Sequence, residues 1–401
     1  MLNEATRDFI HQHLEADVRQ LALQGGRDPE VNLPLALEQI AGRQKARTKI
    51  PSWAAIDGIL YPPHLSMEQC SSELTARYKA GIAGEGNLFV DLTAGFGVDA
   101  AFISKGFSKA VCVERQEQLC NIISENFKTL RKIRIDVVCG DGTAYLHTLD
   151  HADLLFIDPA RRDEHGARTF GIADCTPNVL KMMDEMTEKA DRIIIKLSPM
   201  LDWRKAVEDI GKGVCCVHIV SVENECKELL IEVKSKERRA KSEPSSLRIV
   251  CVNLLSDGRE ERFEFDAKAP VPTKTTCFVN LSGFLFEPNA SIMKAGCFGL
   301  LAERFSLSQL DSNSHLFVSD ADIEGFPGRR FVIDKVTSMN KRDLKEVLAG
   351  ISRANIAVRN FPMPVAELRK RLKLQDGGDV YIFATTVANQ GHRLFVCRKK
   401  S

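Results

Sequence analysis

The sequence of 401 residues lacks the features that mark exported, membrane-spanning and disulfide-rich proteins. No basic stretch followed by an apolar one opens the chain, and no run of about 18 uncharged apolar residues occurs anywhere. The 12 cysteines form no Cys-x-x-Cys motif, and most lie inside apolar runs such as 111–113 and 137–139. We therefore expect a cytoplasmic protein without a membrane partner, whose thiols are reduced and buried.

The sequence also lacks clustered metal ligands and internal repeats. Its nine histidines do not supply ligands at the short spacings of a metal site, so we expect no bound metal. A hydrophobic fraction of 44% with 27% charged residues is typical of globular proteins. Because 401 residues exceed the roughly 250 to 300 that a single core accommodates, we expect two or three domains.

A strong net charge is absent too, but the value of +1 conceals an asymmetry along the chain. Residues 329–401 contain 16 Lys and Arg against 6 Asp and Glu, which leaves residues 1–328 with a net charge of −9. The C-terminal segment is therefore the expected contact for a polyanion.

Apolar spacing predicts a helical N-terminal unit over residues 1–80. Helix-spaced apolar positions occur between residues 3 and 46 and again over 65–79. We expect breaks at Gly25-Gly26 and at Asn32-Leu33-Pro34, and loops at Pro51 and at Tyr61-Pro62-Pro63.

From Leu88 onward, short apolar runs alternate with amphipathic stretches, which predicts a parallel sheet covered by helices on both faces. The last two runs are separated only by residues 223–228, too few for a crossover helix, so they should pair antiparallel. The expected fold class is α/β, with a seven-stranded Rossmann-like sheet in a domain over 81–237. The seven runs are 88–92, 110–113, 135–138, 154–157, 193–197, 214–222 and 229–233.

Two smaller parts follow this domain. Residues 234–246 are charged and contain Pro244, which is typical of a linker. Ser256-Asp257-Gly258 between two apolar runs predicts a β-hairpin in a segment over 245–322. Strand and helix patterns over 323–401 predict a small α+β C-terminal domain.

A glycine turn follows the first strand. Asp91-Leu92-Thr93-Ala94-Gly95-Phe96-Gly97 leads into a helix, and glycine is needed where a backbone turns with positive φ or lies against a ligand. Gly95-x-Gly97-x-x-Ala100 also fits the dinucleotide fingerprint, so the turn by itself leaves the cofactor open.

Acidic residues decide between the cofactors. Asp91 and Asp99 would repel a pyrophosphate at the helix N-terminus, whereas S-adenosylmethionine (SAM) carries a positive sulfonium and a positive ammonium. We therefore predict a SAM site, with cofactor contacts from Asp91, Thr93, Ala94, Gly95, Gly97 and Asp99.

Two more acids follow the next strands. Glu114 comes 23 residues after Asp91, where a carboxylate can accept both hydroxyls of a ribose. Asp141 and Gly142 follow the third strand, where such a carboxylate takes the adenine amine. Each acid alone is better interpreted as a solvated loop residue. Three acids at successive strand ends favour a ligand, because ligands of open α/β sheets bind at the carboxyl ends of the strands.

The fourth strand ends in Asp158-Pro159-Ala160-Arg161-Arg162. Residues 88–200 resemble the class I methyltransferases, and Asp158-Pro159 is similar to the first half of the Asp-Pro-Pro-aromatic motif of enzymes that methylate exocyclic base amines. The resemblance implies that Asp158 and Pro159 orient an amine.

The second half of that motif is replaced, since Ala160 and Arg161 stand where the family has proline and an aromatic residue. A guanidinium plane can stack on a base or bind phosphate, so Arg161 is a candidate catalytic residue and Arg162 a substrate contact. The alternative is a surface loop in which both pair with Asp163 and Glu164. Lys196, at the end of the fifth strand, is expected to face the substrate.

The whole chain resembles a bacterial group of SAM-dependent methyltransferases with a ferredoxin-like segment and a C-terminal THUMP-like domain. The likeness is carried by residues 68–79, 286–290, 294–296, 368–373 and 376–379. Because THUMP domains bind RNA, the resemblance implies an RNA substrate, with Arg369 and Lys373 as contacts.

Three alternatives stay open. The chain is also compatible with an NAD-dependent oxidoreductase, or with an RNA-binding protein whose methyltransferase fold has degenerated. A protein or small-molecule acceptor would also fit the site.

The segment just before the glycine turn has two interpretations. It forms either a lid over SAM or an ordinary N-capped helix, and its polar residues are Ser71, Ser72, Thr75 and Lys79.

Overall fold

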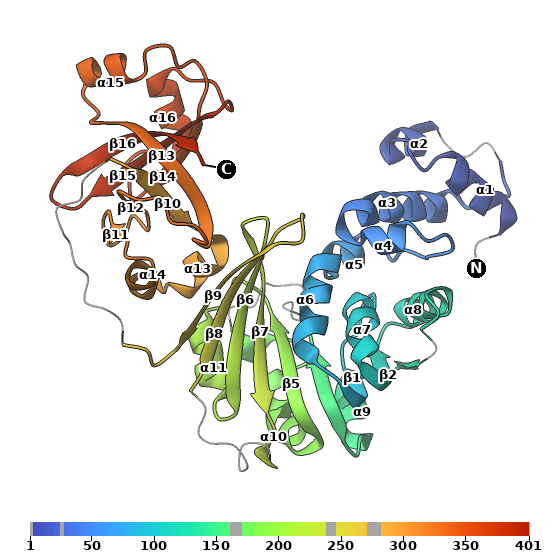
Figure 1. The fold of residues 1–401 in the computed structure, drawn as a ribbon. Coiled ribbons are helices and arrows are strands. Elements are labelled where there is room, and N and C mark those ends of the chain that lie inside the picture. Colours follow the sequence, from blue (N-terminus) through green and yellow to red (C-terminus); the bar gives the residue numbers. More distant parts are fainter. Residues whose placement is uncertain are drawn as a thin grey trace. The chain divides into compact units, whose positions relative to one another are not determined.

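The computed structural model describes residues 3–24, 28–132, 134–160, 171–237, 246–270 and 282–400 (Figure 1). The chain forms two compact units. The first unit comprises Met1–Val217 and Glu228–Ser245, and the second comprises His218–Lys227 and Ser246–Ser401.

Helices precede the first strand, as predicted. Asn32 is the N-cap of the longest of them, where its side chain accepts a hydrogen bond from Leu35 N (3.2 Å), so the predicted break is a helix start. The loop predicted at Pro51 was wrong. Pro51 begins a short helix, because the first helical position needs no N–H donor. Gly25-Gly26 lies outside the described residues. The helices are α1 (Glu4–Gln12), α2 (Val18–Gln24), α3 (Leu33–Lys49), α4 (Pro51–Ala54), α5 (His64–Gln69) and α6 (Glu73–Ala83).

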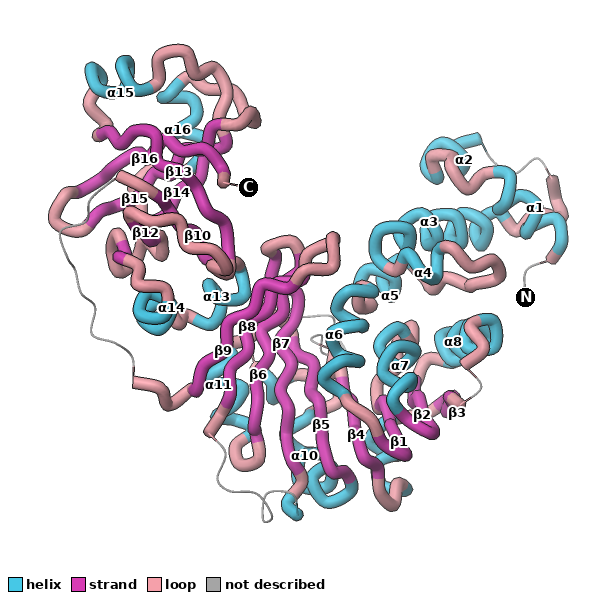
Figure 2. Tube along the Cα trace, viewed as in Figure 1, coloured by secondary structure: helices cyan, strands magenta, loops and turns pink. Residues whose placement is uncertain are grey.

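All seven predicted strands are present, and β1, β2, β3, β4 and β5 pair in parallel. β7 runs antiparallel to β5, and a two-residue turn at Glu223 and Asn224, both with positive φ, joins it to β6. The order is β3-β2-β1-β4-β5-β7-β6 (Figure 2). The strands are β1 (Gly86–Asp91), β2 (Phe107–Glu114), β3 (Ile135–Cys139), β4 (Ala152–Ile157), β5 (Ala190–Leu197), β6 (Val214–Val222) and β7 (Glu225–Lys234).

Helices cover both faces of this sheet, which confirms the expected α/β architecture. Ile193, Ile194 and Ile195 are consecutive on β5 and all inaccessible to solvent, so neither face is exposed there. The helices that follow the strands are α7 (Val98–Ile103), α8 (Glu117–Thr129), α9 (Gly142–Thr148), α10 (Val179–Lys189) and α11 (Trp203–Ile210), with short 3₁₀ turns η1 (Ser104–Gly106) and η2 (Ile172–Asp174).

The predicted hairpin is confirmed as β8 (Arg248–Leu254) and β9 (Glu260–Asp266), which pair antiparallel. It extends the large sheet beyond β6, so the sheet has nine strands and not the predicted seven. Glu223 N donates to Leu254 O at 3.0 Å where the hairpin begins to extend β6. The hairpin thus covers a sheet edge whose backbone groups would otherwise be unpaired.

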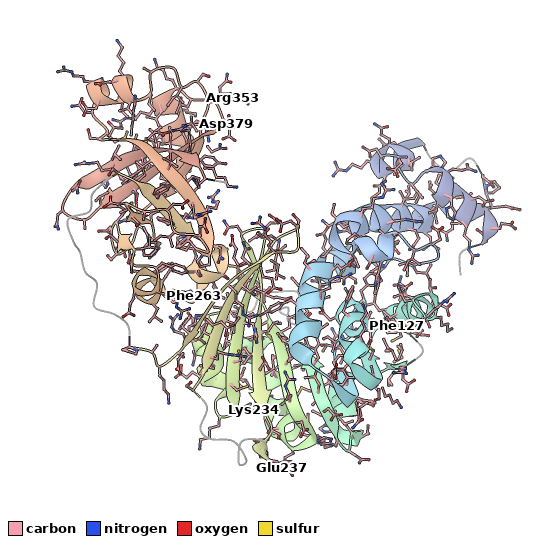
Figure 3. The ribbon with its side chains drawn as sticks, viewed as in Figure 1. Phe127, Lys234, Glu237, Phe263, Arg353 and Asp379 are labelled. Atoms are coloured by element: carbon pink, nitrogen blue, oxygen red, sulfur yellow. The ribbon has the colours of Figure 1, made fainter. Side chains whose placement is uncertain are left out.

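The rest of the second unit contains a seven-stranded sheet in the order β11-β12-β10-β13-β16-β15-β14. Leu285, Phe331, Phe383 and Phe395 belong to its core. The ring centroids of Phe263 on β9 and Phe305 are 6.3 Å apart, and Figure 3 labels Phe263. The elements are β10 (Phe284–Pro288), α13 (Ala290–Ala295), α14 (Phe298–Arg304), β11 (Ser308–Gln309), β12 (Phe317–Ser319), β13 (Gly328–Thr337), α15 (Lys341–Val347), β14 (Asn355–Arg359), α16 (Val365–Leu372), β15 (Val380–Val387) and β16 (Gly391–Lys399).

Among the described helices of both units, none combines the length and the apolar character that crossing a membrane requires.

Candidate functional site

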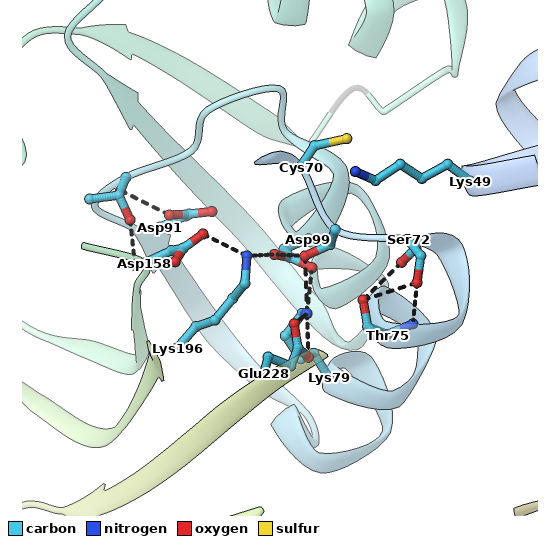
Figure 4. Close-up of polar contacts among 12 residues, drawn as sticks. Lys49, Cys70, Ser72, Thr75, Lys79, Asp91, Asp99, Asp158, Lys196 and Glu228 are labelled. Carbon is cyan, nitrogen blue, oxygen red and sulfur yellow. Dashed lines mark hydrogen bonds and ion pairs between the residues drawn. The ribbon is translucent and has the colours of Figure 1, made fainter. Parts of the chain in front are cut away.

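Parallel pairing places the carboxyl ends of β1 to β5 at one edge of the sheet. Asp91 lies opposite Cys112 of β2 and Phe156 of β4, so the loops after these strands emerge together. Asp91, Asp99, Asp158 and Lys196 come together there, as Figure 4 shows. All four are residues that the sequence analysis singled out for the site.

Glycine is required at two positions of this edge for reasons of packing. Gly97 has φ +78°, and a Cβ on it would lie 2.9 Å from Cζ of Phe127 on α8. A Cβ on Gly142 would lie 2.1 Å from the carbonyl oxygen of Leu92. The backbones of the first and third loops therefore approach each other more closely than any side chain would permit.

Glu114 holds the glycine turn in place. The residue is 8% exposed, and its carboxylate accepts hydrogen bonds from Gly95 N and Gln116 N, both at 2.9 Å. Ala94 N donates to the carbonyl oxygen of Val113 on the same strand (2.9 Å). The turn is thus anchored to the end of β2 by both backbone and carboxylate.

Asp141 is the exposed N-cap of α9. One of its oxygens, Oδ1, accepts from Thr143 N (2.8 Å) and Ala144 N (3.0 Å). The carboxylate is therefore fixed at the start of the helix, at the carboxyl end of β3.

The carboxylate of Asp91 is buried. Asp91 is 1% exposed, and it accepts a hydrogen bond from Thr93 N at 2.9 Å. Burial raises the pKa of Asp91 well above its ordinary value, and the negative charges of Asp99 and Asp158 raise it further. Within the described part of the chain Asp91 forms no ion pair, so a cation placed beside it would be strongly stabilised.

Asp158 is tied to its neighbours on two sides. Its backbone N–H donates to Oγ1 of Thr93 (2.6 Å), and its carboxylate lies 2.6 Å from Nζ of Lys196. The Asp158 side chain is 37% exposed, whereas that of Lys196 is 12% exposed. The acid is therefore oriented from within the protein and keeps an accessible side.

Lys196 remains charged although it is enclosed. Burial lowers its pKa, but the carboxylates of Asp158, Asp99 and Glu228 outweigh burial and raise the pKa above its ordinary value. Lys196 lies 3.7 Å from Asp99 as well as next to Asp158. It thus links the first and fourth loops electrostatically.

A second buried lysine lies behind Asp99. Lys79 of α6 is fully inaccessible, and its Nζ lies 2.7 Å from both oxygens of Glu228 and 3.2 Å from Asp99. The hydroxyl of Ser71 donates to Asp99 (2.7 Å). The sequence did not indicate Glu228, because it stands on an antiparallel strand 149 residues from its partner.

The segment that contains Lys79 is an ordinary capped helix. Ser72 is the N-cap of α6 and accepts from Thr75 N (3.3 Å). This arrangement agrees with the second of the two interpretations offered by the sequence. Ser71 and Lys79 both point to Asp99, so the helix supports the site electrostatically.

Carboxylates outnumber cations in this cluster. Lys79 and Lys196 face the three carboxylates Asp99, Glu228 and Asp158, and Asp91 lies beside them. The edge of the sheet is therefore suited to a positively charged ligand.

Cys70 lies near the same cluster (Figure 4) and is not an activated nucleophile. Burial raises the pKa of its thiol to about 11, although the positive charges of Lys49 and Lys196 oppose this shift. Lys49 donates to the carbonyl oxygens of Met67 and Glu68. Covalent catalysis by this thiol is thereby disfavoured.

The loop that follows Asp158 is described only in part. Pro159 is buried, and Ala160 exchanges two backbone hydrogen bonds with Thr176, at 2.8 and 2.9 Å. Arg161 and Arg162 lie outside the described residues.

Arg369 and Lys373, the predicted RNA contacts, lie in the second unit and differ in their surroundings. The guanidinium of Arg369 donates to the carbonyl oxygens of Ala354 and Gln375 and to the carboxylate of Asp376, at 2.6 to 3.0 Å. Lys373 is exposed and ends α16 with φ +56°. Arg369 therefore stabilises its own domain, while Lys373 is accessible.

Family models match the C-terminal part of the chain. A model described as THUMP domain-like matches residues 328–399, and one described as a ferredoxin-like domain matches residues 284–327.

One solved structure is similar over the whole chain. A protein of Porphyromonas gingivalis W83, described as a candidate methyltransferase, has 30% sequence identity and a TM-score of 0.85, with 100% of both chains covered. An rRNA methylase from Streptococcus thermophilus has 16% identity and a TM-score of 0.31, over 40% of this chain and 94% of its own. TrmK of M. capricolum, in complex with S-adenosyl-homocysteine, has 12% identity and a TM-score of 0.32, over 40% and 68% of the two chains. Both of these TM-scores are too low to support an inference about this chain. A comparison with curated proteins gives no match.

Proposed function

Because the chain belongs to the family of class I methyltransferases that carry a ferredoxin-like segment and a C-terminal THUMP-like domain, we propose that it transfers a methyl group from SAM to RNA. The observation that carries the proposal is the excess of carboxylates at the carboxyl edge of the sheet, with Asp91 buried and unpaired among the described residues. A pyrophosphate would be repelled at this edge, which argues against a dinucleotide.

The residues of the first three loops would hold SAM. Asp91 offers a buried negative charge to the cationic amino acid end, and the turn that contains Thr93, Ala94, Gly95 and Gly97 offers backbone groups. Glu114 is suited to the ribose hydroxyls, and Asp141 with Gly142 to the adenine. Asp99 is engaged by Lys79 and Ser71, so we assign it an electrostatic role behind the cofactor.

The acceptor would meet the fourth loop. SAM, when bound, supplies a methyl group on a positively charged sulfur. Asp158 would accept a hydrogen bond from an exocyclic base amine and offset the positive charge that develops on its nitrogen. Lys196 holds the carboxylate in place at 2.6 Å, and Pro159 restricts the turn. Arg161 and Arg162, which follow directly, would stack on the base or contact its phosphate.

The C-terminal domain would deliver the RNA. Its excess of Lys and Arg contrasts with the negative remainder of the chain, so RNA affinity has to arise locally. Lys373 is exposed at the C-cap of α16 and is suited to this role, whereas Arg369 stabilises the domain through its hydrogen bonds.

Cofactor titration followed by analysis of the product tests the proposal. Calorimetry should detect binding of SAM but not of NAD, and purified chain with SAM should methylate RNA taken from cells that lack the gene. Mass spectrometry of the nucleosides would then identify the methylated base. Binding of NAD alone would indicate an oxidoreductase, and RNA binding without SAM binding would indicate a degenerate methyltransferase fold.

A further inference from the structure

A basic hollow lies at the opposite edge of the large sheet from the proposed SAM site. Its volume is about 160 Å³. Phe107 begins β2 and Ile135 begins β3, so the hollow is located at the amino ends of parallel strands. It is lined by Ser104, Lys105, Phe107, Arg131, Lys132, Arg134 and Ile135.

The basic hollow is lined by four cationic side chains. Among the residues that the structure describes, Lys105, Arg131, Lys132 and Arg134 form no ion pair. Nearby lysines of the same region are paired, since Lys109 lies 3.0 Å from Asp136 and Lys128 lies 2.7 Å from Glu125. The four cations of the hollow therefore differ from these two neighbouring lysines, each of which has an acidic partner.

The pKa of Lys132 is lowered by its position in the basic hollow. Lys132 is half-buried, and burial lowers the pKa of its ammonium, as does the positive charge of Lys105. The negative charge of an anion in the hollow would act against both effects, because it stabilises the protonated ammonium. A phosphate suits the four cationic side chains and the hydroxyl of Ser104, because it accepts several charge-assisted hydrogen bonds at once.

An apolar hollow of about 150 Å³ adjoins the basic one and shares Lys105 and Lys132 with it. The centroid of the Phe102 ring lies 5.0 Å from Nζ of Lys105 and 5.2 Å from the guanidinium carbon of Arg77. The lining is Ser52, Trp53, Ile56, Arg77, Ala101, Phe102, Lys105, Leu130 and Lys132. Trp53 and Phe102 are buried, so a base in this hollow would pack on the exposed Ile56 and on the guanidinium plane of Arg77.

We propose that the two hollows together bind single-stranded RNA, with a backbone phosphate in the basic hollow and a neighbouring base in the apolar one. The inference rests on the RNA substrate proposed above. Four cations exceed the charge of one phosphodiester, so the basic hollow fits a chain of phosphates better than a single nucleotide. This surface would hold the substrate on the unit that contains the proposed catalytic residues, independently of the C-terminal domain.

The test compares RNA affinities of full-length variants. Lys105→Ala, Lys132→Ala and Arg134→Ala are combined in one variant, and Lys128→Ala is the matched control, because Lys128 is an exposed cation already paired with Glu125. Fluorescence anisotropy with a labelled single-stranded RNA is measured at several salt concentrations. We expect the triple variant to bind at least about tenfold more weakly, and its dependence of log affinity on log salt to fall by about 2, from about 0.7 per lost contact.

Two further measurements distinguish a loss of phosphate contacts from misfolding and from a loss of base contacts. Arg134→Glu changes one exposed side chain, and should weaken RNA binding while the affinity for SAM is unchanged. An abasic oligonucleotide of the same length should bind the unchanged protein more weakly, because the apolar hollow loses its occupant.

Each outcome decides between the hypotheses. RNA affinity and salt dependence that are equal in the triple variant and the Lys128→Ala control would refute this site, while SAM-dependent methylation of RNA would leave the proposed function standing. Methyl transfer to a different acceptor without any RNA binding would refute both. Binding of adenosine monophosphate as tight as that of the oligonucleotide, and lost in the triple variant, would replace RNA with a free nucleotide.

Discussion

At the scale of single residues, Asp91 is the buried carboxylate of the candidate site that a cationic ligand would stabilise most. Its carboxylate is buried near Asp99 and Asp158, and among the described residues its hydrogen-bond donor is the N–H of Thr93. Such a group costs stability when it is charged and unliganded, yet attracts a cation. Removing the charge of Asp91 should therefore weaken cofactor binding and raise the stability of the folded protein.

We predict that Asp91→Asn weakens SAM binding about ten- to a hundredfold while leaving the melting temperature unchanged or higher. Because the pKa of Asp91 is raised in the folded protein, its ionisation opposes folding once the pH exceeds the ordinary pKa of aspartate. The stability gained by the variant should thus grow from about pH 4 upward and level off above the folded-state pKa. Calorimetry of SAM binding and melting curves over this pH range test it. Unchanged SAM affinity would remove Asp91 from the cofactor site.

Asp158 is predicted to act on the acceptor and not on the cofactor. Asp158→Asn keeps the shape of the side chain and removes its charge, so turnover should fall about a hundredfold or more while SAM affinity changes little. Single-turnover kinetics and calorimetry separate the two quantities. If both fall together with the melting temperature, the pair of Asp158 with Lys196 is structural.

At the scale of elements, the contact between Lys79 and Glu228 joins helix α6 to strand β7. Both side chains are buried, so removing one partner leaves an uncompensated charge inside the protein. The pair also fixes Asp99 through Lys79, which connects the helix with the candidate site.

Lys79→Met is therefore predicted to destabilise the protein by about 3 to 5 kcal/mol, because Glu228 and Asp99 lose their cation. Adding Glu228→Gln should restore part of this loss, so the two changes are not additive. Urea denaturation of both single variants and the double variant measures the coupling. As a control, Lys205→Met removes an exposed pair with Asp209 and should change stability by less than about 1 kcal/mol. Additive effects at positions 79 and 228 would contradict the coupling.

At the scale of the whole molecule, charge is distributed unevenly between the parts of the chain. The basic C-terminal residues belong to a sheet that also contains β10, β11 and β12, because β13 pairs with both β10 and β16. A cut near residue 322 would divide this sheet and open the core around Leu285 and Phe331. The contribution of the domain to RNA binding is better tested in the full chain.

We predict that replacing Lys370, Arg371 and Lys373 together with alanine weakens RNA binding and lowers the salt dependence by about 2, since all three side chains are exposed. SAM affinity should stay the same. Arg369→Ala should instead lower the melting temperature, because its guanidinium donates hydrogen bonds to Ala354, Gln375 and Asp376. Salt titrations by fluorescence anisotropy and melting curves distinguish these effects. Equal RNA affinity in the triple variant would exclude this face of α16.

The sequence by itself determined the features that depend on neighbouring residues. Apolar runs specified the strands, the turn from Asp91 to Gly97 specified the start of α7, and Ser256-Asp257-Gly258 specified a hairpin. Parallel strands end at one edge, so the positions of Asp91, Glu114 and Asp158 after successive apolar runs predicted that the three residues lie at the same edge of the sheet.

Only the tertiary structure decided which charges meet and which remain unpaired. Lys79 finds Glu228 across 149 residues, and the hairpin of β8 and β9 joins the large sheet instead of standing apart. The basic hollow likewise combines Lys105 with Arg134, from separate loops. These outcomes depend on strand order, burial and the distance between side chains, which local patterns of apolar and charged residues do not encode.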